Sequence, residues 1–78
     1  MKEYLVIYEQ AEEGGWRAHC ADMEVFVIGR TREEAEELVT EGIVRHIESG
    51  LWEGRPIPEP RTEAARVAID TEIATPSP

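Results

Sequence analysis

The sequence lacks several features that define whole classes of protein. It has a single cysteine, Cys20, so no disulfide can form within the chain, and a lone thiol fits a reducing compartment better than secretion. No apolar run approaches the ~20 residues that span a bilayer. The opening Met1-Lys2-Glu3 does not have the pattern of a signal peptide. We therefore expect a cytoplasmic protein that folds around a non-covalent core.

Basic residues are also scarce. The 78 residues include 17 acidic and 8 basic side chains, which gives a formal net charge of −9. Direct binding of nucleic acid needs a basic surface that displaces counterions, so this charge argues against it. The charge favours either simple solubility or a basic partner. The length allows one small domain with a thin stability margin, and such chains often gain stability by forming oligomers.

Three short apolar segments predict β-strands at residues 3–9, 16–20 and 25–29. Gly14-Gly15 indicates a hairpin turn between the first two segments, because glycine adopts positive φ at little cost. The first segment is apolar on both sides: one side carries Tyr4, Val6 and Tyr8. We therefore expect it to be a central strand that is covered on both faces.

A charged amphipathic helix is predicted over residues 32–49. Thr31 and Glu34 have the spacing of a capping box, in which the threonine accepts from the N3 amide and the glutamate accepts from the cap amide. Gly42 falls on the apolar stripe, where we expect it to allow close approach to the sheet. Gly50 has the position of a helix-ending C′ residue.

A fourth strand is predicted at residues 64–70, after an extended proline connector at 55–60. The fold class is then α+β, with the order β-β-β-α-β. A right-handed crossover places the fourth strand beside the first, so the expected sheet order is 3-2-1-4 with one helix on one face. Residues 1–72 form the single expected domain, and residues 73–78 form an expected disordered tail.

One helix leaves one face of this sheet uncovered. Because the first strand is apolar on both sides, we expect the uncovered face to be buried between subunits of a homodimer or a larger even-numbered oligomer. The interface residues expected from this argument are Tyr4, Val6 and Tyr8.

Chemistry-bearing residues form no recognisable catalytic or metal-binding pattern. The two histidines, His19 and His46, have no zinc-site spacing with Cys20, and the glutamates of the helix fall mainly on its solvent side. We therefore expect no catalytic residue, no metal and no cofactor. Trp52 either packs under the proline connector or anchors a contact between subunits.

The order of motifs resembles the HicB-like antitoxin family over residues 2–70. The family pattern has a Tyr/Val/Ile strand, a Gly-Gly-aromatic-x-Ala strand, a Gly-Asp-Thr-x-Glu-Glu-Ala helix start and a Pro-x-Pro connector. The matching segments here are Tyr4-Leu5-Val6-Ile7, Gly14-Gly15-Trp16-Arg17-Ala18, Gly29-Arg30-Thr31-Arg32-Glu33-Glu34-Ala35 and Pro56-Ile57-Pro58. Arg30 replaces the usual aspartate, and the family's Pro-Gly-Cys turn is absent.

The resemblance implies a partial RNase H-like fold and an antitoxin that binds a small basic HicA-type mRNA-cleaving toxin, without a DNA-binding domain of its own. The partner-binding residues expected on this hypothesis are Glu36, Glu37, Glu41 and Trp52. An alternative is a structural or interaction protein of the same family without a toxin. A remote third hypothesis is a vestigial metal-dependent nuclease that uses Glu9 or Asp70.

Overall fold

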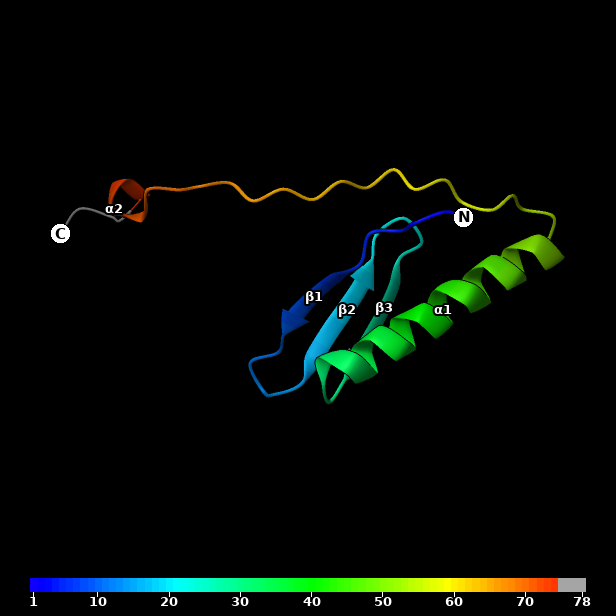
Figure 1. Cartoon of the computed structure of the whole chain (residues 1–78), viewed down its shortest axis with the longest axis horizontal. Coiled ribbons are helices and arrows are strands. Elements are labelled where there is room, and N and C mark those ends of the chain that lie inside the picture. The colour runs from blue at the N-terminus through cyan, green and yellow to red at the C-terminus, as the bar shows by residue number, and fades with distance from the viewer. Residues whose placement is uncertain (75–78) are drawn as a thin grey trace.

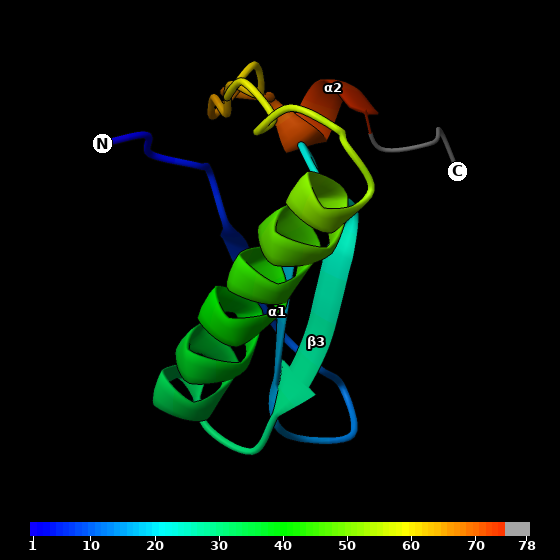
Figure 2. The same ribbon diagram turned by 90° about the vertical axis from the view of Figure 1, so that its right-hand side faces the viewer.

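The computed structural model describes residues 1–74 and has three strands and two helices in that range. The strands are β1 (Ile7–Gln10), β2 (Trp16–Cys20) and β3 (Val25–Gly29), and the helices are α1 (Arg32–Trp52) and the four-residue α2 (Thr71–Ala74). The strands form one antiparallel sheet in the order β1-β2-β3, and α1 lies against one of its faces (Figures 1 and 2). The predicted α+β class is confirmed at this level.

The core lies between α1 and the sheet and is built from small side chains. Its buried residues are Ala18, Cys20, Met23, Ala35 and Val39, and the largest completely buried side chains among them are Val39 and Cys20. Gly42 faces β3 on the helix, where an added Cβ would lie 2.6 Å from Cγ1 of Val25. This confirms the predicted close approach of the helix to the sheet.

The start of α1 follows the predicted cap with one change. The Thr31 hydroxyl accepts a hydrogen bond from the Glu34 amide at 3.0 Å, as a capping residue should. The Glu34 carboxylate, however, accepts from the Arg30 amide at 2.9 Å rather than from the amide of Thr31. The reciprocal bond therefore reaches one residue further back than in a standard capping box.

The end of α1 differs from the prediction. The helix continues through Gly50 to Trp52, so Gly50 is not the C′ residue. Gly54 takes that position with a φ of +80°, and its amide donates to the Leu51 carbonyl at 3.1 Å. The Arg55 amide donates to the Gly50 carbonyl at 2.7 Å, which completes a Schellman motif. The helix is long enough but not apolar enough to cross a membrane, and α2 is far too short.

The predicted fourth strand is not in the sheet. Residues 64–70 are extended but pair with no strand, and β1 is an edge strand rather than a central one. All residues of this segment are exposed, and beyond residue 66 the segment leaves the body of the molecule (Figure 1). The expected order 3-2-1-4 is therefore not found here. Of the expected tail, 73–74 belong to α2, whereas 75–78 lie outside the described residues.

The connector after α1 is fixed to the body at three points. The Tyr4 hydroxyl donates to the Pro58 carbonyl at 2.7 Å, and the Lys2 ammonium pairs with Glu59 at 2.8 Å. Asp22 Oδ1 accepts from the Arg61 amide at 3.0 Å and from the Thr62 hydroxyl at 2.7 Å. These bonds hold the connector across the N-terminal segment and the β2–β3 turn.

Replacing the N-cap residue tests where α1 begins. Thr31→Ala removes the acceptor for the Glu34 amide, so we expect a loss of about 1 kcal/mol in the free energy of unfolding. Thr31→Asp restores an acceptor and should recover most of that loss. Chemical denaturation of the three proteins measures the difference. Equal stability of wild type and Thr31→Ala would contradict this helix start.

Replacing Asp22 tests the fixed connector. Its hydrogen bonds from Thr62 and Arg61 favour the ionised carboxylate, so they hold the pKa of Asp22 below its ordinary value of 3.8. The stabilisation from these hydrogen bonds is therefore complete at pH values above 3.8, and it is lost as the pH falls through the lowered pKa of Asp22. Slow hydrogen exchange of the Arg61 amide should therefore be lost in strong acid.

Two variants separate the charge of Asp22 from its hydrogen bonds. Asp22→Ala should abolish the protection of the Arg61 amide at every pH, because no acceptor remains. Asp22→Asn keeps a carbonyl acceptor that does not titrate, so it should retain protection with less dependence on pH. Unchanged exchange in Asp22→Ala would show that this contact does not hold the connector.

Candidate partner-binding surfaces

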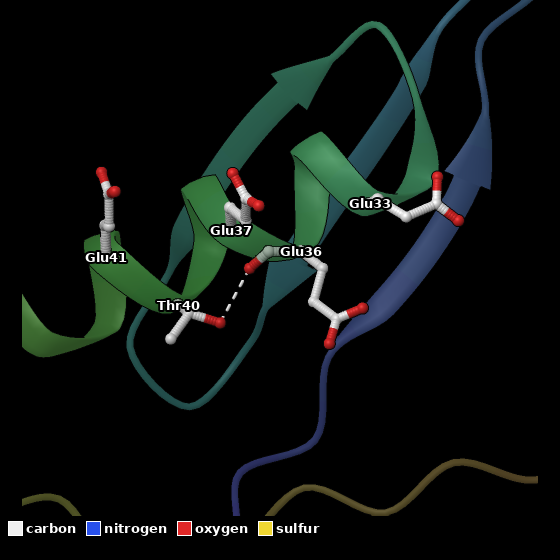
Figure 3. A pocket seen from close by; sticks show the side chains of 5 residues that line it. All are labelled: Glu33, Glu36, Glu37, Thr40 and Glu41. Carbon is white, nitrogen blue, oxygen red and sulfur yellow. Dashed lines mark hydrogen bonds between the residues drawn. The ribbon is translucent and has the colours of Figure 1, made fainter.

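The outer side of α1 is an acidic surface. Four glutamates and one threonine line a shallow depression there: Glu33, Glu36, Glu37, Thr40 and Glu41 (Figure 3). They recur at three- and four-residue steps because the inner positions of the helix, Ala35 and Val39, are buried against the sheet. We call the carboxylates of these four glutamates the acidic face.

One of these carboxylates is partly neutralised. Glu36 pairs with Arg32 at 3.4 Å, and the Arg32 guanidinium also lies 4.1 Å from the ring centre of Tyr8. Burial raises the pKa of the Tyr8 hydroxyl and the charge of Glu36 raises it further, whereas Arg32 acts in the opposite direction. Tyr8 therefore remains neutral at physiological pH and connects β1 to the first turn of α1.

The other three glutamates of the acidic face carry charges that the described chain leaves unpaired. Among residues 1–74, the ion pairs join Lys2–Glu59, Arg17–Glu9, Arg32–Glu36 and Arg55–Glu53. Glu33, Glu37 and Glu41 take part in none of them. Figure 3 shows the side chains of Glu37 and Glu41 extending away from the ribbon of α1. A cation from a partner would therefore not have to break an ion pair to reach them.

Trp52 lies at the end of the same helix and is 91% exposed. It follows Glu41 by eleven residues, which places the two within about 20° around the helix axis and about 16 Å apart along it. The neighbouring Leu51 is 52% exposed. Trp52 therefore does not pack under the proline connector, and its role as an anchor for a contact stays a prediction.

All four predicted partner-binding residues are therefore at the surface, on one helix. Glu36 is the least available of them because of its ion pair with Arg32. Whether any of the four binds a partner stays a prediction.

The predicted oligomer-interface residues lie elsewhere than expected. Tyr4, Val6 and Tyr8 are partly buried and pack against the core, on the helix-covered side of the sheet. The uncovered side of the sheet is the opposite one. It carries two cross-strand rows that follow the strand register: Ile7–His19–Phe26 and Glu9–Arg17–Ile28. Their place in the fold gives Tyr4, Val6 and Tyr8 a structural role, and their part in an interface remains untested.

The open side of the sheet exposes large apolar side chains. Ile7, Phe26 and Ile28 are 49%, 58% and 64% exposed, and the His19 ring lies 5.8 Å from that of Phe26. Arg17 pairs with Glu9 at 3.1 Å beside them. Alternation within one strand does not show which residues of neighbouring strands share a side of the sheet. The hairpin register supplies that link.

The remaining chemistry-bearing residues are dispersed. Cys20 is completely buried, and no group of three His, Cys, Asp or Glu side chains within residues 1–74 is placed to hold a metal ion. Glu9 pairs with Arg17 on the sheet, whereas Asp70 accepts from the Glu72 amide at the start of α2. The structure does not bring these two acids together.

Comparison with known proteins adds no assignment to these surfaces. No protein-family model matches the chain, and no curated protein matches it significantly.

Proposed function

We propose that this protein is a binding module that captures a small basic protein on the acidic face of α1, with Trp52 as an apolar anchor. The observation that carries the proposal is the alignment of unpaired carboxylates and a 91% exposed tryptophan on the outer side of one helix. Complementary charge accelerates encounter and selects the partner, and a large aromatic side chain supplies binding energy when it is desolvated.

The partner class follows from the motif resemblance. The sequence resembles HicB-like antitoxins, so the proposed partner is a small basic mRNA-cleaving toxin of the HicA type, which this chain would neutralise by covering its surface. The partial RNase H-like fold and a fourth strand beside β1 belong to the same proposal. The net charge of −9 supports a basic protein partner over direct contact with nucleic acid.

A second function is favoured by a different observation. The exposed Ile7, Phe26 and Ile28 form an apolar surface on the sheet, which α1 does not cover. Such a surface is typical of a protein that assembles with others. On this alternative the protein is a structural or interaction module without a toxin partner.

Charge reversal on α1 tests the first function. The double variant Glu37→Lys/Glu41→Lys should weaken binding to the toxin candidate, the product of a short basic reading frame beside this gene, by at least tenfold. Trp52→Ala should weaken it by about thirtyfold if the side chain is a hot spot. Calorimetry in low and high salt measures both, and the wild-type affinity should fall as salt rises.

The matched control is Glu12→Lys/Glu13→Lys, which makes the same change in net charge within the β1–β2 turn. It should bind nearly as tightly as wild type if the site is on α1. An equal loss of affinity in both double variants would show that net charge, rather than a site on α1, causes the loss. The absence of any small basic protein that co-purifies at low salt from the source cells would remove the proposal.

A further inference from the structure

The segment of residues 63–70, which we call the C-terminal arm, pairs with no strand within the described residues 1–74. It is extended, and no hydrogen bond joins residues 63–69 to any other part of the described chain. Its side chains nevertheless alternate as in a half-buried strand: Val67 and Ile69 share one side with Ala65, and Arg66 and Asp70 lie on the other. Val67 and Ile69 are 76% and 66% exposed.

The arm makes the chain far less compact than its length requires. The radius of gyration is 16.6 Å, against about 11.5 Å for a compact domain of this length. The accessible surface is 6691 Å², which exceeds the roughly 4,800 Å² expected of a compact monomer of 8.8 kDa. The excess, roughly 1,900 Å² per chain, is of the size that obligate dimers bury.

The outer edge of β1 has no partner strand within the described residues. β1 pairs only with β2, so its other edge presents unpaired backbone groups. α1 packs mainly on β2 and β3, and it leaves Tyr8 of β1 and the preceding Val6 only partly buried. A strand added at this edge would pair with β1 and bring two apolar side chains against Val6 and Tyr8.

The arm does not pair with the β1 edge of its own chain. The bonds from Tyr4, Lys2 and Asp22 fix the connector as far as Thr62, and residues 64–66 pass close to Ile7 and Tyr8. Beyond that point the arm leaves the body, and Figure 1 shows it running past β1 to the far end of the molecule. The base of the arm is therefore held next to the edge that needs a strand, while its apolar residues extend away.

We infer that the occupant is a second copy of this chain: each arm adds as a fourth strand to the β1 edge of the other subunit. The sheet has two open edges, at β1 and at β3, and the base of the arm lies beside β1. Two chains related by a two-fold axis can therefore each supply an arm to the β1 edge of the other, and this exchange is closed. A partner of another kind would leave one of the two features unfilled. This assembly is independent of the proposed binding of a basic protein, which uses α1.

Sedimentation of the full chain tests the exchange. At micromolar concentration we expect a dimer of twice 8.8 kDa. The variant Val67→Asp/Ile69→Asp should raise the dimer dissociation constant by at least a hundredfold, because two side chains buried in the exchange become charged. Arg66→Glu is the matched control: it makes the same change of −2 in net charge from the polar side of the arm, and it should remain largely dimeric.

A mixed-label experiment decides which chain receives the arm. The double variant Ala68→Cys/Cys20→Ala is prepared without ¹⁵N and carries a spin label on residue 68. It is mixed and refolded with ¹⁵N-labelled wild type. Broadening of the ¹⁵N amides of residues 7–10 shows that the arm of one chain lies on β1 of the other. Broadening only when both labels are in one chain would overturn the inference, as would no broadening at all.

Sedimentation and the mixed-label experiment each give a result that supports or contradicts the exchange. A wild-type monomer at 100 µM would contradict the exchange directly. If Val67→Asp/Ile69→Asp fails to fold, the mixed-label experiment still decides, because it keeps both apolar side chains of the arm. Failure of the basic-protein proposal would leave these results unchanged, so the two ideas can be rejected separately.

Discussion

The close packing of α1 on the sheet is the constraint on which the rest of the structure depends. Glycines make it possible: a Cβ on Gly29 would lie 2.6 Å from the Ala35 amide nitrogen, and one on Gly42 would lie equally close to Val25. Between the helix and the sheet, no side chain larger than Val39 or Cys20 is completely buried, and the larger apolar side chains there are only partly buried. A core of such small residues removes little apolar surface from water, so a single chain has a thin stability margin.

Much apolar surface remains outside the core. Ile7, Phe26 and Ile28 on the sheet, Trp52 on the helix and Val67 and Ile69 on the arm are all substantially exposed. Three different elements thus carry surfaces that burial would stabilise. We propose a basic partner for the helix surface and a second copy of the chain for the arm. Because these elements are separate, a dimer made by arm exchange would display one acidic face from each subunit.

The sequence predicted the local elements well because each has a local cause. The alternation of β2 and β3, the Gly14-Gly15 turn and the Thr31 cap all follow from residues close in the chain, and the structure has them. The prediction for residues 64–70 was different in kind. Alternation predicts that a segment is suited to a sheet, but it contains no information about which edge, or which chain, supplies the partner strand.

The candidate surfaces, too, were predicted correctly only where a local pattern places the residues. Helical spacing was enough to place Glu37 and Glu41 on the solvent side of α1, and the structure agrees. The choice between the two faces of β1 was not decidable from one strand that is apolar on both sides, and Tyr8 lies on the covered face. The contact of Asp22 with Thr62 joins residues 40 apart in sequence, and no local pattern predicts it.

Amide hydrogen exchange across the C-terminal arm tests the account most directly. The central claim is that the folded body is complete only when the arm of another copy pairs with β1. We predict that alternate amides of residues 64–70 exchange slowly at high protein concentration and lose that protection on dilution, together with the outward-facing amides of β1. Arm amides that exchange freely at every concentration, or stay equally protected at the lowest one, would contradict the claim.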